Sequence, residues 1–114
     1  MGKFVKIVVY TPISHAEKVR VALASAGCGH IGKYDFCSFS VKGIGRFRPL
    51  KGAKPFVGKA PPSGTAAGKV EKIAEERIET ICLKVKLKKT LAAVRAVHPY
   101  EEPAIDVYPL VNYV

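Results

Sequence analysis

Apolar residues recur along this chain with two different periods, and each change of period predicts where a strand gives way to a helix. Residues 3–10 are almost continuously apolar and β-branched, which is typical of a strand buried on both faces. Residues 19–26 then carry apolar side chains at helical spacing, and Gly27 is placed to end that helix. Ser14 and Glu17 fit a capping box, with Ser14 as the N-cap. The start of the chain therefore predicts a strand followed by a helix.

A second strand is predicted over residues 34–41, where apolar and polar side chains alternate. The strand is expected to be half-buried, with Phe39 in the core. Residues 42–45 contain two glycines and are typical of a tight reversal, so residues 46–48 predict a short returning arm. The Gly- and Pro-rich stretch over residues 49–69 then predicts a long loop.

The rest of the chain predicts a strand over residues 71–85, an amphipathic helix over 87–97 and a last strand over 105–110. This order and the length of 114 residues favour one α+β domain over residues 1–114. The fold expected is a ferredoxin-like βαββαβ two-layer sandwich, with an extended connection between its second and third strands. In that fold the connections that follow the first strand, the second strand and the second helix lie at the same end of the sheet.

Residues 98–104, His-Pro-Tyr-Glu-Glu-Pro-Ala, place an imidazole, a phenol and two carboxylates between two prolines. Each proline fixes its own φ and pushes the preceding residue toward extended geometry, so the segment predicts a stiff, non-helical bend. One interpretation is a rigid turn, and the other is a ligand or metal site. For a metal, His98, Glu101 and Glu102, with His15 from the same end, suit zinc or a similar divalent ion.

The formal net charge of +10 is unevenly distributed. No acidic residue occurs between Phe36 and Val70, so this stretch is expected to attract anions, or else to be a solvated loop. Candidate partners are nucleic acid, small anionic metabolites and an acidic protein surface. The candidate ligand-binding residues are basic side chains of this stretch and the phenol of the bend: Lys42, Arg46, Arg48, Lys54 and Tyr100.

Cysteine spacing and hydropathy predict the compartment. Cys28, Cys37 and Cys82 show no C-x-x-C spacing, which indicates buried free thiols in a reducing environment. No apolar run approaches the roughly 20 residues that span a bilayer, and the first residues lack the apolar core of a signal peptide. A cytoplasmic protein without a membrane segment is expected.

Two groups of motifs resemble one known family. Residues 29–39, continuing to Phe47-Arg48-Pro49, form the first group, and Arg77-Ile78-Glu79 with residues 98–104 form the second. Together they resemble the inserted domain of the YqfO-type (Ngg-interacting-factor-three-like) proteins, a hexameric family with a dinuclear metal centre. The bend at residues 98–104 is also similar to the corresponding turn of CutA, and both belong to the PII-like group of ferredoxin-like folds.

The resemblance implies a PII/CutA-like fold, a homo-oligomer with a trimer favoured, and a non-catalytic binding or regulatory role. The ligand it implies is a small anion or a divalent metal, held at a cleft between subunits. The dinuclear metal centre and the suggested hydrolase activity of the family belong to flanking domains, which lie outside these 114 residues. Metal-hydrolase activity is therefore not expected of this chain.

Three other functions are weighed against this one. A nucleic-acid-binding domain is compatible with the fold and the charge, but exposed aromatics flanked by glycine and basic residues in the RNP pattern are not evident. An enzyme could use Tyr100 with Glu101, or His98 with Glu102, as acid and base, but no activated nucleophile accompanies them. A structural protein-interaction module is the third alternative.

Overall fold

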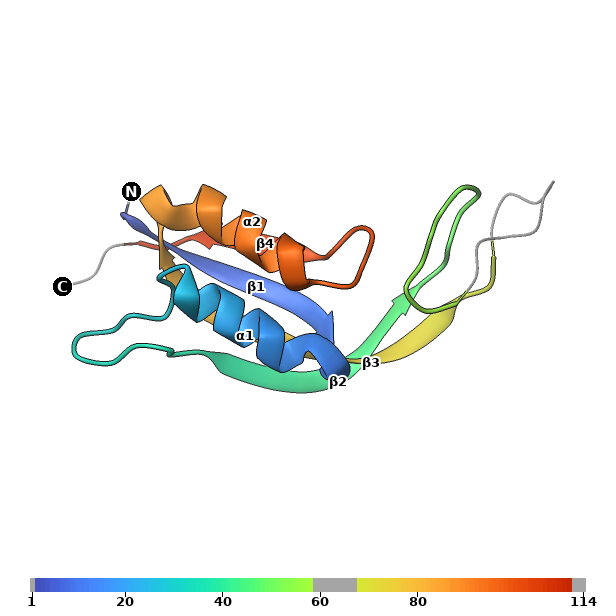
Figure 1. Ribbon diagram of the computed structural model, residues 1–114, viewed down its shortest axis with the longest axis horizontal. Helices are drawn as coiled ribbons and strands as arrows, with labels where there is room; N and C mark the ends of the chain where they lie inside the picture. The colour runs from blue at the N-terminus through green and yellow to red at the C-terminus, as the bar shows by residue number, and fades with distance from the viewer. Residues whose placement is uncertain (1, 59–67, 112–114) are drawn as a thin grey trace.

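The computed structural model describes residues 2–58 and 68–111. The predicted order of strands and helices is confirmed (Figure 1). The elements are β1 (Phe4–Pro12), the 3₁₀ turn η1 (Ile13–His15), α1 (Ala16–Ser25), β2 (Phe39–Phe47), β3 (Glu71–Leu83), the 3₁₀ turn η2 (Lys84–Lys86), α2 (Leu87–Val97) and β4 (Ile105–Pro109). Residues 59–67 of the predicted long loop lie outside the described residues.

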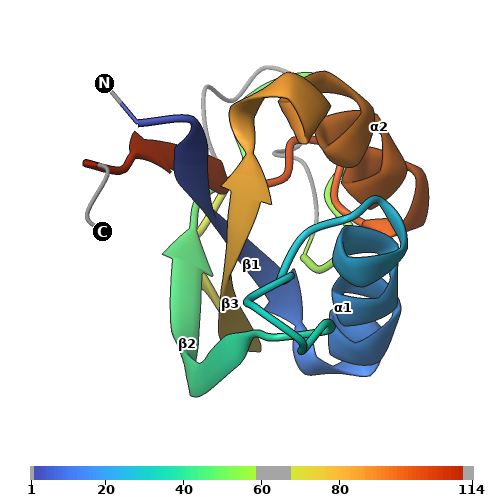
Figure 2. The same ribbon diagram turned by 90° about the vertical axis from the view of Figure 1, so that its left-hand side faces the viewer.

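The four strands form one antiparallel sheet in the order β2-β3-β1-β4. Both helices cover the same face of this sheet, and the other face carries no second layer within the described chain (Figure 2). This is the predicted two-layer ferredoxin-like arrangement. No helix of the described residues is long and apolar enough to cross a membrane.

The core lies between the helices and the two central strands. Ile7 and Val9 of β1 and Ile78 of β3 are fully buried, and Val19 of α1 and Val94 of α2 pack on them. Alternation in β1 and β3 sends every second side chain to the helical face. Each such side chain contributes about 1.5–3 kcal/mol by leaving water, so the sheet and both helices depend on one core.

The start of α1 differs from the prediction, whereas its end agrees. His15, not Ser14, is the N-cap, and no side chain caps the helix. Ser14 lies inside η1, where its Oγ is 2.8 Å from Nδ1 of His15. The capping box is therefore wrong, because the 3₁₀ turn places Ser14 one residue too early. Gly27 follows the helix with φ of +104°, as its stop signal predicts.

The second strand also differs. Residues 42–45 are not a reversal, because β2 runs without a break from Phe39 to Phe47 and pairs with β3 throughout. The predicted core position of Phe39 is wrong: Phe39 is 65% exposed, since it lies opposite Glu79 on the sheet face without helices. Alternation predicted which residues share a face but not which face the helices cover.

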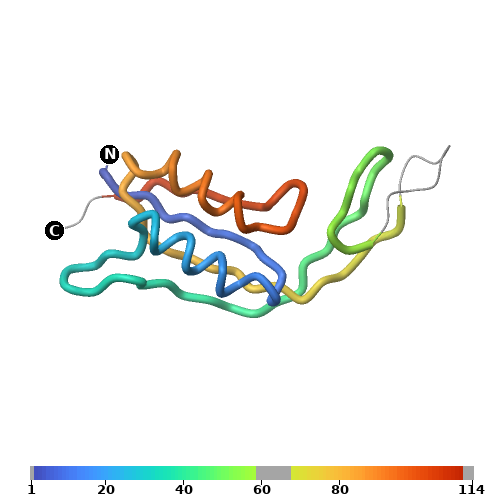
Figure 3. The backbone as a smooth tube through the Cα atoms, viewed as in Figure 1, coloured from blue at the N-terminus to red at the C-terminus, as the bar shows by residue number. Residues whose placement is uncertain are grey.

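The outer halves of β2 and β3 extend beyond the helices as a two-stranded arm, which the backbone trace follows clearly (Figure 3). The arm makes the molecule elongated, with extents of 56 × 27 × 21 Å. It carries the described loop residues 48–58 to the end of the sheet where the bend after α2 lies (Figure 1). The arm thereby builds one wall of the candidate site.

Candidate functional site

The three predicted connections meet at one end of the sheet. The ring of Phe56, from the loop after β2, lies 5.6 Å from the His15 ring and 6.1 Å from the Tyr100 ring. The backbone N–H of Lys54 donates to Oε1 of Glu101 at 2.9 Å. The predicted proximity of the loop, the bend and His15 is confirmed.

His98 fastens the bend to β1. Its side chain is buried, with 7% exposed, and Nε2 donates to the backbone oxygen of Tyr10 at 2.7 Å. Because a carbonyl only accepts, this bond assigns the proton to Nε2, and Nδ1 then accepts from the backbone N–H of Tyr100 at 3.2 Å. Burial lowers the pKa of His98, which keeps the imidazole neutral.

Tyr100 points from the bend to the arm. Its hydroxyl donates to Oε2 of Glu75 on β3 at 2.6 Å. Burial, together with that hydrogen bond, raises the pKa of Tyr100, so the phenol keeps its proton. The Glu75 carboxylate lies where a side chain at position 45 would stand, and Gly45 on β2 leaves that space open. A glycine in the neighbouring strand thus makes room for the contact between bend and arm.

A cavity of about 620 Å³ lies between the arm and the bend. Apolar side chains make most of its surface, with Phe47, Leu50 and Phe56 among them. Its charged residues are two arginines and three glutamates, namely Arg46, Arg48, Glu75, Glu101 and Glu102. A volume of this size suits a small organic molecule.

The predicted ligand-binding residues divide into two groups. Arg46, Arg48 and Tyr100 line the cavity. Lys54 contributes its backbone N–H to Glu101, and Lys42 lies further along β2, opposite Glu76 and away from the cavity lining. Only the first group is therefore placed to contact a molecule in this cavity.

Sequence reasoning missed Glu75 and Gly45. Glu75 lies 25 residues before Tyr100, and no local spacing connects the two. The alternation of β3 places Glu75 on one face, but only the pairing of Gly43 with Glu75 and Gly45 with Ile73 brings it beside the open glycine. The sequence did not predict this register, because a reversal was expected at residues 42–45 and no pairing with β3 was expected there.

The structure does not assemble the predicted metal ligands. Within residues 2–58 and 68–111, no three His, Cys, Asp or Glu side chains are grouped as a metal ion requires. Both ring nitrogens of His98 are used by backbone groups, so the lone pair that a metal needs is occupied. The bend turns His98 inward against β1, whereas Glu101 and Glu102 are exposed, so the imidazole and the carboxylates lie in different environments.

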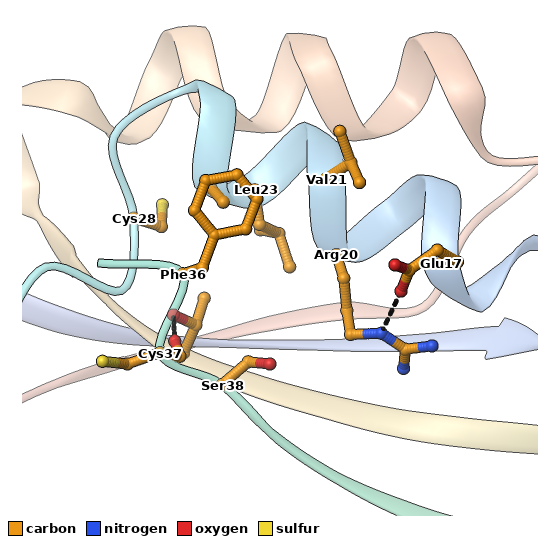
Figure 4. A pocket seen from close by; sticks show the side chains of 10 residues that line it. Glu17, Arg20, Val21, Leu23, Cys28, Phe36, Cys37 and Ser38 are labelled. Carbon is orange, nitrogen blue, oxygen red and sulfur yellow. Dashed lines mark hydrogen bonds and ion pairs between the residues drawn. The ribbon is translucent and has the colours of Figure 1, made fainter. Parts of the chain in front are cut away.

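A second, smaller cavity of about 200 Å³ lies between α1 and the segment that leads into β2 (Figure 4). Glu17 and Arg20 are its charged residues, and Arg20 bonds to Glu17 at 2.8 Å and to the buried Glu76 at 2.6 Å. These hydrogen bonds raise the pKa of Arg20. Since Arg20 is already paired twice, it serves here to join α1 to β3.

The cysteines are free thiols, as predicted, but the predicted burial is wrong for Cys37, which is only partly buried. Cys28 and Cys82 are buried, and both sulfurs lie near the hydroxyl of Thr90, at 3.6 and 3.8 Å. Burial raises the pKa of Cys28 to about 12, so this thiol stays protonated. Cys37 is partly exposed, and its backbone oxygen accepts from Thr80 Oγ1 at 2.7 Å.

Comparison with known proteins identifies relatives of this segment. It is 47% identical over 107 residues to a GTP cyclohydrolase 1 type 2 homolog of Halalkalibacterium halodurans, covering 94% of this chain and 27% of that protein. The homolog of Bacillus subtilis is 47% identical over 105 residues, covering 92% of this chain and 26% of that protein. The chain thus spans about a quarter of the length of these curated relatives. No protein-family model matches it.

Solved structures agree with the fold. A Bacillus cereus protein related to NIF3 superposes with a TM-score of 0.79 at 44% identity, covering 96% of this chain and 26% of that one. The periplasmic divalent cation tolerance protein CutA from Archaeoglobus fulgidus superposes at 0.67 with 17% identity, covering 97% of this chain and 87% of that one. GlnK of Bacillus subtilis superposes at 0.55 with 17% identity, covering 99% of this chain and 90% of that one. At 17% identity the last two show a common fold.

Proposed function

From the homology of this chain to the inserted PII/CutA-like segment of the NIF3-related GTP cyclohydrolase 1 type 2 homologs, we propose that it is a non-catalytic binding or regulatory module. Its ligand is a small organic molecule with an anionic group. The observation that carries the proposal is the cavity between arm and bend, where Arg46 and Arg48 line an otherwise mainly apolar surface. Arginine is suited to this role because its guanidinium holds carboxylate or phosphate through two parallel hydrogen bonds.

The bend supports binding rather than catalysis. His98 and Tyr100 are its candidate acid–base groups, and both are engaged in contacts that hold the bend in place. The lowered pKa of His98 and the raised pKa of Tyr100 keep both side chains neutral near pH 7. We therefore place the cyclohydrolase activity named for the relatives outside this segment.

Oligomerisation belongs to the same proposal. The sheet face without helices carries Phe39, Val41 and Tyr108, which are 65%, 47% and 46% exposed. Burying such a patch against further copies favours assembly, because it removes apolar surface from water. In the trimer that we propose, the arm of one subunit lies beside its neighbour and the cavity lies at an inter-subunit cleft.

Isothermal calorimetry of the purified chain tests the ligand. A panel of small organic anions is titrated into the wild type, into the double variant Arg46→Gln/Arg48→Gln and into Lys42→Gln. A ligand of the cavity loses at least about tenfold in affinity in the double variant, the loss expected when charged hydrogen bonds are removed. Lys42→Gln, a basic residue of the same strand outside the cavity, leaves its affinity unchanged. Equal losses in both variants would refute an arginine site.

Light scattering tests the assembly. The wild type is expected at three times the chain mass, and Val41→Asp is expected at the mass of one chain, because it places a charge in the buried face. Val21→Asp is the matched control, since Val21 is 44% exposed but lies on α1. A wild type that is monomeric over the micromolar range would refute the trimer.

A further inference from the structure

The cavity between arm and bend carries opposite charges on different walls. Arg46 and Arg48 belong to β2 and its extension, whereas Glu101 and Glu102 belong to the bend. The three ion pairs found among the described residues involve none of these four side chains. The two arginines and the two glutamates therefore line one cavity from different elements, with no ion pair between them.

The charge balance of the lining argues against a simple anion. With Glu75 included, three carboxylates oppose two guanidinium groups, so the lining has a formal charge of −1. An inorganic anion would be attracted by one wall and repelled by the other. A molecule that carries an anionic group at one end and a donor group at the other satisfies both walls.

Glu101 and Glu102 have carboxylate oxygens that can accept hydrogen bonds from a ligand. Oε1 of Glu101 accepts the Lys54 N–H, which leaves its second carboxylate oxygen for a ligand. Glu102 is exposed and lies in the same lining. These carboxylates suit an ammonium group or another strong N–H donor, because charge-assisted hydrogen bonds are about twice as strong as neutral ones.

The apolar residues of the lining indicate that the ligand has an apolar body between its polar groups. Leu50 and Phe56 line the cavity and are 57% and 48% exposed, so a bound molecule would bury apolar surface of both side chains. Phe56 is also held between His15 and Tyr100, which orients its ring. A flat apolar body fits such a surface.

We infer that the ligand of this cavity is amphoteric, with an apolar body that joins an anionic group for Arg46 and Arg48 to a cationic or N–H-donating group for Glu101 and Glu102. The inference rests on the proposed function and deepens it by giving the ligand class. It excludes inorganic phosphate and purely anionic organic acids as preferred ligands.

Three matched probes test it by NMR titration of the ¹⁵N-labelled chain. 4-(Aminomethyl)benzoate carries a carboxylate and an ammonium group at opposite ends of an apolar ring, 4-methylbenzoate lacks the ammonium group, and 4-methylbenzylamine lacks the carboxylate. 4-(Aminomethyl)benzoate is expected to bind at least about tenfold more tightly than either of the others, with shifts at residues of the cavity lining. Inorganic phosphate is the simple-anion control and is expected to bind more weakly than 4-(aminomethyl)benzoate.

The double variant Glu101→Gln/Glu102→Gln separates the inference from the proposed function. Gln at position 101 keeps an oxygen for the Lys54 N–H, so the loop stays attached while the charge is lost. In this variant the preference for 4-(aminomethyl)benzoate over 4-methylbenzoate should fall to within about twofold. If the preference survives, or if 4-methylbenzoate binds the wild type as tightly as 4-(aminomethyl)benzoate, the inference is overturned while an arginine-dependent anion site still stands. If none of the probes binds, this inference is overturned, and the calorimetric panel then decides the proposed function separately.

Discussion

Replacing His98 tests the two hydrogen bonds that fasten the bend to β1. His98→Phe keeps a ring of similar size but leaves the Tyr10 carbonyl and the Tyr100 N–H without their partner. The site is largely closed to water, since His98 is 7% exposed. An unsatisfied buried polar group costs about 1–3 kcal/mol, so the loss of both partners should lower the free energy of unfolding by about 2–6 kcal/mol.

Two further variants divide this cost. Asn at position 98 can accept from the N–H two residues on, as in an Asx turn, but is too short to reach the Tyr10 carbonyl. Gln has the longer reach and can donate to that carbonyl, while its amide is poorly placed for the Tyr100 N–H. The expected order of stability is wild type, then His98→Asn and His98→Gln, then His98→Phe. Urea unfolding followed by circular dichroism measures it, with m-values compared to confirm that the denatured state is unchanged.

The reasoning is refuted if His98→Phe unfolds within about 0.5 kcal/mol of the wild type, the range of ordinary surface substitutions. It is also refuted if His98→Asn and His98→Gln are both as unstable as His98→Phe, because restoring one of the two hydrogen bonds would then recover no stability. In that case packing of the imidazole, rather than its hydrogen bonds, would hold the bend.

The same residue predicts a pH dependence. Because burial lowers the pKa of His98 in the folded state, the unfolded chain binds the proton first as pH falls. The stability that the neutral His98 contributes is thus fully present above the pKa of histidine in the unfolded chain, about 6.5. It is lost as the pH falls below that pKa, by up to about 1.4 kcal/mol for each pH unit. The difference in unfolding free energy between wild type and His98→Gln, measured at pH 7.5 and 5.5, isolates this effect. A difference that is constant or that grows in favour of the wild type at pH 5.5 contradicts it.

Two other substitutions test the arm and the helix contact. Gly45→Ala places a Cβ against the Glu75 carboxylate and should lower the free energy of unfolding by about 1–3 kcal/mol. Gly43→Ala lies on the same strand with open space around it, so its free energy of unfolding, measured by heat or urea, should be within about 0.5 kcal/mol of the wild-type value. Equal effects at both positions would mean that the two variants report strand propensity alone. Arg20→Ala leaves the buried carboxylate of Glu76 unpaired and should cost about 3 kcal/mol in the same assay; a loss below about 0.5 kcal/mol would mean that water replaces the guanidinium at no cost.

The predicted fold depended on local patterns, and these were reliable where burial is strong. The continuous apolar run of β1 and the helical spacing of α1 and α2 each determine an element without reference to the rest of the chain. The prediction of the second strand was wrong because β2 is mostly exposed and its local pattern is weak. Two glycines at positions 43 and 45 are typical of a turn, but pairing with β3 over its full length outweighs that local preference.

The candidate site was only partly predictable. Strand direction alone predicted that the loop after β2 and the bend after α2 would meet, and the Lys54–Glu101 and Phe56–Tyr100 contacts confirm it. Which side chains face the cavity was not predictable, because that depends on register and on the path of the loop. The basic stretch that the sequence places between residues 36 and 70 becomes part of a cavity of mixed charge once β3 and the bend bring their glutamates to it.

The sequence by itself determined the kind and order of the strands and helices and the ferredoxin-like class, since hydrophobic periodicity acts over a few residues. The tertiary structure decided what the bend does with its chemistry. His98, predicted as a metal ligand, turns inward because the carbonyl of Tyr10 and the N–H of Tyr100 both need a partner there. Tyr100 becomes a donor to Glu75 because Gly45 leaves room for the carboxylate. Such roles are set by groups far apart in the sequence, and only folding brings them within hydrogen-bond distance.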